Sequence, residues 1–176
     1  SRLVYGRPQR LPVDETHPTH PTSMYGIHKL MAEHYLRLYY ELYGLQTVAL
    51  RITNPYGPNH VSEGQKYSIL NIFMKLAQED RMISIYGDGA QLRDFIYIGD
   101  LVEALLWVGK SPNVVGDVFN ISGGRATSLL EAAEVIVAEV GRGSIVMVPW
   151  PEDAMQVETG DFLADIRKIY RADRKS

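Results

Sequence analysis

The chain has 176 residues, of which 45% are hydrophobic and 22% are charged, a composition typical of a globular protein with a sizeable core. Its net charge of −3 provides no basic surface for nucleic acid, and no run of about 18 apolar residues is present to cross a membrane. We therefore expect neither nucleic acid nor a membrane as a partner. The absence of cysteine excludes disulfides and thiolate chemistry, and we expect a cytoplasmic location.

Residues 1–6 are an apolar stretch that ends at a glycine, and we expect them to be the end of a buried strand. Because the sequence opens without a methionine, we expect it to be part of a longer protein. Residues 7–22 contain four prolines and predict a loop that crosses the surface. His17 and His20 flank prolines in this loop, and we expect them to be surface residues rather than metal ligands.

A long helix is predicted from Met24 to Tyr43. Thr22 or Ser23 can cap its amino end, and Gly44 suits the left-handed position that follows a helix. Apolar and aromatic residues cover more than one stripe of this helix. The pattern therefore indicates packing on two sides, against its own sheet and against a partner.

Strand-like and helix-like segments alternate after this helix. The predicted strands are residues 46–53, 82–86, 94–98, 115–122 and 144–148. The predicted helices are residues 67–79, 99–108, 128–141 and 164–171, with turns at 54–59 and 87–89 and a solvated acidic loop at 152–161. This alternation indicates an α/β fold with parallel strands. The chain contains no Gly-x-Gly-x-x-Gly dinucleotide-binding turn.

Tyr25 and Lys29 stand at the front of the predicted long helix, four residues apart, and so lie on the same helical face. A free tyrosine has a pKa of about 10 and is a poor base at neutral pH. A neighbouring positive charge lowers an acid's pKa by about 1–3 units. Lowering it to about 7 needs roughly 4 kcal/mol, which a second cation such as an oxidised nicotinamide ring could help to supply. By itself, this spacing also fits an accidental arrangement on an ordinary helix.

Further segments follow in an order and spacing that carry a resemblance. They are Ser1 with Val4-Tyr5-Gly6, Tyr25-x-x-x-Lys29, Leu50-Arg51-x-x-Asn54-Pro55-Tyr56-Gly57-Pro58, Gly87-Asp88-Gly89-x-Gln91-x-Arg93-Asp94-Phe95-Ile96-Tyr97-x-x-Asp100-Leu101 and Phe119-Asn120-Ile121. With these segments the chain resembles the extended short-chain dehydrogenase/reductases, specifically the nucleotide-sugar epimerase/dehydratase group, from residue 1 to about residue 170.

The resemblance implies the C-terminal part of a Rossmann-type doubly wound sheet plus a small α/β substrate-binding domain. Residues 1–55 are then expected to end the NAD-binding Rossmann domain, with the catalytic helix and the strand that follows it. Residues 56–176 are expected to form mainly the nucleotide-sugar-binding domain, with some segments returning to the Rossmann domain.

The resemblance also implies catalytic roles for three residues. Tyr25 resembles the catalytic base, and Lys29 resembles the residue that activates it and holds the nicotinamide ribose. Ser1 resembles the residue that hydrogen-bonds the reacting sugar oxygen. Tyr25, Lys29 and the backbone around Ile52 and Pro55 are thus expected to contact NAD. No metal site is expected.

Four further residues are expected to bind a nucleotide-diphosphate sugar. Asn54 resembles the residue that touches the sugar and diphosphate, and Ser84 and Tyr86 belong to the segment against which the nucleotide base lies. Arg93 resembles the arginine that pairs with the diphosphate, a role that its two-pronged guanidinium suits. The alternative for Arg93 is an ion pair with Asp88 or Asp94.

Two departures from the family pattern bear on function. Dehydratases carry an Asp-Glu pair after the serine or threonine, because eliminating water needs an acid and a base at adjacent carbons. Here Arg2 and Leu3 occupy those positions, which argues against dehydration. Epimerases often have an arginine before the final Ala-Asp, where this chain has acidic residues, so the way in which the second phosphate is held stays open.

The resemblance implies an NAD-dependent nucleotide-sugar 4-epimerase, most similar to the UDP-glucose/UDP-galactose type, that acts through a transient 4-keto sugar. A reductase or dehydratase of the same family, or a non-catalytic nucleotide-sugar-binding module, are the alternatives. The helix that begins near Tyr25 resembles one that pairs with its copy in a homodimer, which would account for its two apolar sides.

Overall fold

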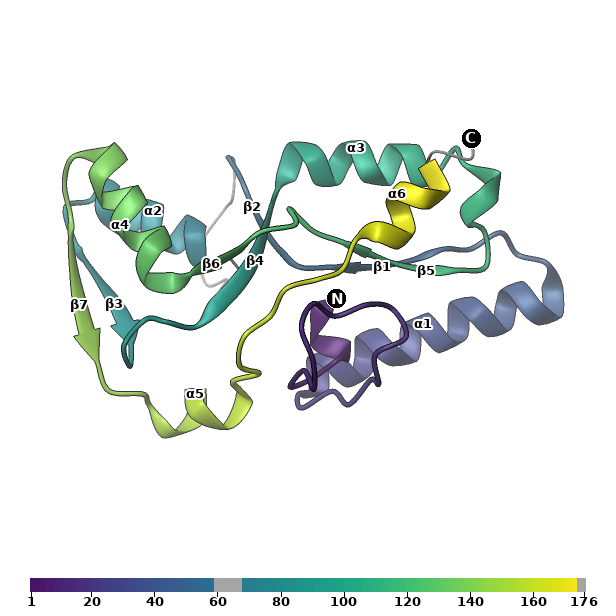
Figure 1. Ribbon diagram of the computed structural model, residues 1–176, viewed down its shortest axis with the longest axis horizontal. Coiled ribbons are helices and arrows are strands. Elements are labelled where there is room, and N and C mark those ends of the chain that lie inside the picture. Colours follow the sequence, from purple (N-terminus) through teal and green to yellow (C-terminus); the bar gives the residue numbers. More distant parts are fainter. Residues whose placement is uncertain (59–67, 174–176) are drawn as a thin grey trace.

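The computed structural model describes residues 1–58 and 68–173. The last residue of the turn expected at 54–59 and the first of the helix expected at 67–79 lie outside these ranges. In Figure 1, one end of the molecule holds helices α2 (Ile69–Gln78), α4 (Leu129–Val140) and α5 (Glu152–Val157) and strands β3 (Met82–Tyr86) and β7 (Ser144–Val148). The other end holds strands β1 (Ala49–Ile52) and β5 (Val118–Ile121) and helices α1 (Met24–Tyr43), α3 (Ile98–Val108) and α6 (Arg167–Asp173). Strand β4 (Leu92–Tyr97) runs between the two ends.

Helix α1 spans Met24–Tyr43, as predicted. The Ser23 side chain accepts a hydrogen bond from the backbone N–H of Gly26 at 3.1 Å, and Gly44 ends the helix in the left-handed region at φ 66°. These are the caps expected of a serine and a glycine at such positions. Strand β1 (Ala49–Ile52) follows and pairs in parallel with β5 (Val118–Ile121).

The segment expected to be a turn at 54–59 begins instead with strand β2 (Asn54–Tyr56), so that prediction was wrong. β2 is an outer strand of a three-stranded sheet, next to β4 (Leu92–Tyr97), which also pairs with β6 (Ala126–Ser128). An outer strand tolerates Pro55, which has no N–H to donate. The Asn54 side chain also joins the sheet, since its Nδ2 donates to the Asp94 carbonyl at 2.9 Å.

Strands β3 (Met82–Tyr86) and β7 (Ser144–Val148) form a two-stranded parallel sheet, with the bounds that the sequence predicted. Helices α2 (Ile69–Gln78) and α4 (Leu129–Val140) pack on one face of it. Ile83 and Ile85 point into that core, whereas Met82, Ser84 and Tyr86 lie on the opposite face and are exposed. The strict alternation of buried and exposed positions leaves one face of this sheet open.

Residues 1–6 do not end a strand, contrary to the sequence prediction. Arg2–Val4 form the short 3-10 helix η1, and Val4 and Tyr5 are buried against Phe162 and Val13. The apolar character of this stretch therefore reflects burial by a turn that packs on neighbouring segments, rather than strand pairing. His17 is also buried, at 3% exposure, because its ring lies edge-on to Tyr5 and its Nε2 accepts from the Gln9 N–H at 3.0 Å. The expectation of a surface residue was wrong for His17.

The remaining helices are α3 (Ile98–Val108), η2 (Pro112–Val114), α5 (Glu152–Val157) and α6 (Arg167–Asp173). The acidic segment predicted as a loop thus contains helix α5. Buried clusters centre on α2–β3–α4, on the N-terminal segment with Phe162, and on β5 with α3. The proposed domain boundary near residue 55 stays a prediction. Among the described residues, no helix is both long and apolar enough to cross a membrane.

A buried polar network joins α1 to the sheet and to the N-terminal segment. The Arg51 guanidinium on β1 binds the Glu33 carboxylate of α1, with Nη2–Oε2 at 2.8 Å and Nε–Oε2 at 3.1 Å. Its Nη1 donates to the Tyr5 hydroxyl at 3.0 Å, and that hydroxyl donates to Asn120 Oδ1 at 2.7 Å. Burial raises the pKa of Tyr5 to about 12, so the hydroxyl keeps its proton at neutral pH.

Replacing Tyr5 with phenylalanine tests this network in the full-length protein. The change leaves Asn120 Oδ1 and one Arg51 N–H without their partner in a buried setting, which costs about 1–3 kcal/mol of unfolding free energy. Urea denaturation measures this loss. Tyr170→Phe is the matched control, because Tyr170 is 59% exposed, and we expect a change within about 0.5 kcal/mol. Equal stability of the two variants would contradict a structural role for the network.

Candidate functional site

The structure brings Tyr25 and Lys29 together at the amino end of α1. Both side chains are exposed, Tyr25 at 46%, and the Lys29 Nζ lies 5.3 Å from the centre of the Tyr25 ring. The four-residue spacing thus produces the contact that it predicts. The pair presents a hydroxyl and an ammonium to the same region of the surface, which is the donor set of an acid–base site.

The turn that Ser1 begins, η1, lies against the first turns of α1, and Gly26 leaves room for this approach. A Cβ atom on Gly26 would lie only 2.5 Å from the Leu3 carbonyl oxygen and 2.9 Å from the Pro21 Cβ. The Ser1 hydroxyl accepts from the Leu3 N–H at 3.3 Å, which fixes it at the start of η1. The three residues predicted to be catalytic therefore come from two segments that only a glycine allows to meet.

Asn54 lies where β1 gives way to β2. Its Oδ1 accepts from Arg2 Nε at 3.3 Å, so the residue predicted to bind substrate contacts η1 directly. Ile52 and Pro55 flank it and are partly buried. Together they form the edge at which the family resemblance places the nicotinamide ring.

Arg93 does not pair with Asp88 or Asp94, the partners considered from sequence. Its Nη2 binds both carboxylate oxygens of Glu158, at 2.8 and 2.7 Å. Nη1 donates to the carbonyls of Leu92 and Gly160. The residue predicted to bind diphosphate is therefore already neutralised from within the chain, by an acid from the segment expected to be a solvated loop.

The Asp94 side chain, by contrast, is fully buried. Its Oδ2 accepts from the Ser122 hydroxyl at 2.7 Å and from the Ala164 N–H at 2.9 Å. Burial raises the pKa of this carboxyl. Asp94 thus joins β4, the end of β5 and the C-terminal segment, and it has a structural position.

Ser84 and Tyr86 lie on the open face of β3, and Tyr86 contacts Trp150, which follows β7. The rings of Tyr86 and Trp150 are 5.4 Å apart. Gly87, in the left-handed region at φ 67°, allows this approach, since a Cβ there would lie 2.6 Å from Trp150 Nε1. A flat nucleotide base could lie against such a surface. The only sequence signal for Trp150 was its place after a predicted strand.

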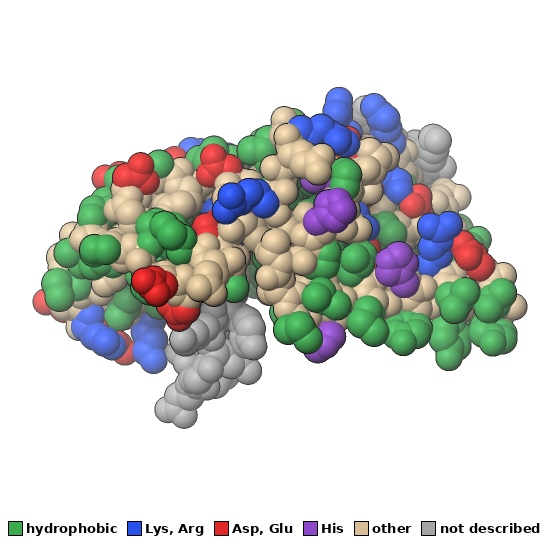
Figure 2. Space-filling model, turned by 90° about the horizontal axis from the view of Figure 1, so that it is seen from below, with side chains coloured by type: hydrophobic (Ala, Val, Ile, Leu, Met, Phe, Trp, Pro, Cys, Tyr) green, Lys and Arg blue, Asp and Glu red, His purple; other side chains and the backbone are tan. Residues whose placement is uncertain are grey.

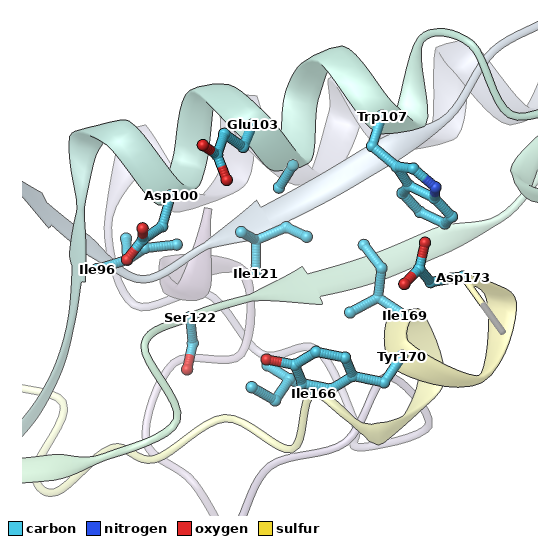
Figure 3. A pocket seen from close by; sticks show the side chains of 11 residues that line it. Ile96, Asp100, Glu103, Trp107, Ile121, Ser122, Ile166, Ile169, Tyr170 and Asp173 are labelled. Atoms are coloured by element: carbon cyan, nitrogen blue, oxygen red, sulfur yellow. The ribbon is translucent and has the colours of Figure 1, made fainter.

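A separate cavity of about 330 Å³ lies between α3, α6 and β5. Figure 3 shows isoleucines from β4, β5 and α6 among its lining, together with Asp100 and Glu103 on α3 and Asp173 on α6. None of the residues predicted to contact substrate or cofactor lines this cavity. Among the residues that the structure covers, no group of three or more His, Cys, Asp or Glu side chains could hold a metal ion.

Comparisons with known proteins identify the family of the chain. Residues 1–122 match the NAD dependent epimerase/dehydratase family. The chain belongs to this family. The match includes Ser1, the Tyr25–Lys29 pair, Asn54 and Arg93, and it agrees with the resemblance drawn from the sequence motifs.

Individual relatives differ in their sugars. The chain is 39% identical over 144 residues to a putative UDP-glucose 4-epimerase of Methanocaldococcus jannaschii, covering 81% of this chain and 46% of that protein. It is 34% identical over 160 residues to ADP-L-glycero-D-manno-heptose-6-epimerase of Alkalilimnicola ehrlichii, covering 86% and 49%. The chain thus spans about half the length of these curated relatives.

Solved structures confirm the fold. UDP-glucose 4-epimerase of Thermotoga maritima with UDP-glucose superposes with a TM-score of 0.87 at 29% identity, over 96% of this chain and 53% of that one. The α/β fold of this chain is therefore that of the Rossmann-type epimerases and dehydratases, of which NAD is the cofactor.

The close approach at Gly26 gives a test of how the site is assembled. Alanine favours a helix over glycine by about 1 kcal/mol, yet at position 26 its Cβ collides with the Leu3 backbone. We expect Gly26→Ala to destabilise the full-length protein in thermal denaturation. Gly109→Ala is the control, because its Cβ would meet nothing nearer than 3.4 Å, and we expect no loss there. A stabilised Gly26→Ala protein would show that η1 is not held against α1.

Proposed function

We propose that the full-length protein is an NAD-dependent epimerase of a nucleotide-diphosphate sugar, of the UDP-glucose/UDP-galactose 4-epimerase type. The observation that carries the proposal is the exposed contact between Tyr25 and Lys29, with Ser1 held beside it across Gly26. The relatives named above support epimerisation of nucleotide sugars. They act on different sugars, so the 4-epimerase assignment rests on the motifs and on the two named UDP-glucose 4-epimerases.

The residues present fit NAD at one part of its site. The exposed Lys29 ammonium and Tyr25 hydroxyl suit the hydroxyls of a ribose, and the edge formed by Ile52 and Pro55 suits a flat ring. When bound, NAD would accept a hydride from the sugar and return it. These four residues would hold its nicotinamide end.

The chain's own residues then perform the acid–base steps. Tyr25 as phenolate takes the proton of the sugar hydroxyl, and the Lys29 ammonium favours that phenolate electrostatically. The Ser1 hydroxyl hydrogen-bonds the same sugar oxygen and so fixes its position. After the 4-keto sugar has turned over, so that reduction would occur on the opposite face of C4, Tyr25 returns the proton to the C4 oxygen.

The position after Ser1 argues against the dehydratase alternative. Eliminating water needs an acid and a base at adjacent carbons. Burial lowers the pKa of Arg2 to about 10, so it stays charged and donates no proton at neutral pH, and Leu3 carries no titratable group. A reductase would use the same Tyr25 and Lys29 but would consume NADPH, and a binding module would hold the nucleotide sugar without turnover.

Replacing Tyr25 with phenylalanine tests the assignment of the base. Full-length protein is given UDP-galactose without added reductant, and UDP-glucose formation is followed by chromatography. We expect Tyr25→Phe to lower turnover by about 10²–10⁴-fold, the usual contribution of a positioned acid–base group. The fold should persist, because Tyr25 is half-exposed.

The controls separate the alternatives. Tyr170→Phe alters another exposed tyrosine, outside the site, and should keep full turnover. Sugar conversion that survives in Tyr25→Phe would rule out Tyr25 as the base. Consumption of added NADPH by the unaltered protein, without epimerisation, would support the reductase instead.

We also propose a homodimer through α1. Only Gly26 is fully buried in this helix, and Figure 2 shows hydrophobic side chains gathered over the part of the surface that α1 forms. Large exposed apolar and aromatic residues extend along its whole length, and they include Met24, Met31, Tyr35, Leu38, Tyr39, Leu42 and Tyr43. A surface of this kind favours association with a partner.

A charge on this surface should break the dimer. Leu42 is 63% exposed, and Leu42→Glu places a carboxylate where a second helix would pack. Analytical ultracentrifugation of the full-length protein should show a dimer for the unaltered protein and a monomer for this variant. Val135→Glu, at a position on α4 that is 56% exposed, should leave the mass unchanged. A variant dimer as stable as the original would exclude this interface.

A further inference from the structure

Two arginines lie near each other at the junction of η1, β2 and β4. Arg2 comes from η1 and Arg93 from β4, and the positive charge of Arg93 acts on Arg2. The Glu158 carboxylate forms an ion pair with Arg93, at 2.7 Å, and forms none with Arg2. Arg93 is therefore paired directly with a carboxylate, whereas Arg2 is not.

The hydrogen bonds of Arg2 all go to neutral oxygens. Its Nε donates to Asn54 Oδ1 at 3.3 Å, and its Nη1 donates to Thr159 Oγ1 at 3.0 Å. The guanidinium carbon lies 5.3 Å from the centre of the Phe162 ring. Within residues 1–58 and 68–173, no ion pair includes Arg2 and its Nη2 donates no hydrogen bond. Arg2 thus keeps donors available for another group.

Such a cation is costly without an anionic partner. Removing a charged group from water is unfavourable unless a counter-charge and hydrogen bonds replace the water. Arg2 is partly buried and stays protonated at neutral pH, since its pKa is about 10. A ligand that brings negative charge would supply the missing partner.

Arg93, unlike Arg2, already has a carboxylate partner for its guanidinium group. Both Glu158 oxygens bind its Nη2, and the carbonyls of Leu92 and Gly160 occupy its Nη1. An incoming phosphate would have to compete with a carboxylate of this chain. Lys29 lies over the Tyr25 ring. Of these three cations, Arg2 is the one that combines partial burial and unused donors with the absence of a direct ion pair in the described part of the chain. The carboxylates of Glu158 and Asp94 act on it only through space.

We propose that Arg2 binds the diphosphate of the nucleotide sugar and that Glu158 keeps Arg93 in place as a neutral pair behind it. This inference rests on the proposed function. A guanidinium can donate two parallel hydrogen bonds to phosphate oxygens, which suits this ligand. Asn54 then has two roles. It faces the sugar, and by accepting a hydrogen bond from Arg2 it orients the Arg2 side chain toward the substrate.

Calorimetry on the full-length protein tests the assignment. Affinities are measured for UDP, dTDP and ADP and for the matching nucleosides, which lack phosphate, and the best-bound base is used. We expect Arg2→Gln to weaken the nucleoside diphosphate by about 10- to 100-fold, the range of charge-assisted hydrogen bonds, and to leave the nucleoside unchanged. Arg2→Lys should recover part of the loss because it restores a point charge.

Two further variants control for misfolding of Arg2→Gln and for the general effect of removing an arginine. Arg2→Met keeps the aliphatic stem over Phe162 and serves if Arg2→Gln does not fold, with the same expected loss. Arg81→Gln is the matched control, because Arg81 is 64% exposed and pairs with Glu79 on the surface, and it should change neither affinity. Unchanged diphosphate affinity in Arg2→Gln or in Arg2→Met would overturn the proposal.

Two other outcomes would also overturn it. Equal weakening of diphosphate and nucleoside, together with a lower melting temperature, would make Arg2 a structural clasp between η1 and Thr159. Weakened binding of UDP-glucuronate with unchanged binding of UDP would make Arg2 a reader of a sugar carboxylate. Binding needs no turnover, so a protein that binds diphosphate through Arg2 but converts no sugar would reject only the epimerase proposal.

Discussion

The contact of Arg51 with Glu33 and Tyr5 joins α1 to the N-terminal segment, and these two segments carry the three residues predicted to be catalytic. Arg51 is 7% exposed, and its guanidinium lies 4.7 Å from the centre of the Tyr5 ring while binding the Glu33 carboxylate. A buried ion pair contributes little net folding stability. Removing one of its partners nevertheless destabilises a protein strongly, because the other charge stays buried without a counter-charge. The value of this pair is geometric, because it links α1, β1 and the N-terminal segment through one planar group. Lys29 and Tyr25 lie about one and two helical turns, respectively, before Glu33 on the same face of α1.

That placement brings the N-terminal segment over the amino end of α1. With Tyr5 anchored to Arg51 and Asn120, residues 1–4 must turn back as η1, and Gly26 leaves room for the Leu3 carbonyl. Ser1 and Arg2 are then held on adjacent positions of one short turn. The residues proposed for acid–base chemistry and the cation proposed for phosphate therefore share a single support. A disturbance of this support would alter the orientation of both at once.

Local patterns were sufficient for much of the fold and for part of the site. Helix α1 and strands β3 and β7 have the predicted bounds, because caps and alternation are encoded within each segment. The nature of residues 1–6, the strand at Asn54 and the burial of His17 depend on contacts with distant residues, and those predictions failed. The Tyr25–Lys29 contact follows from helical spacing alone. The partner of Arg93 lies 65 residues away, and no local pattern points to Glu158.

The exposure of the Tyr25–Lys29 pair bears on when the base can act. Water between and around two exposed groups screens the interaction of their charges. A bound nucleotide sugar and a nicotinamide ring would cover the pair and exclude that water, and the same charge would then act through a medium of lower dielectric. Activation of Tyr25 would thus be coupled to occupancy of the site. On this view, a diphosphate held at Arg2 helps to seal the surface that makes Tyr25 a base.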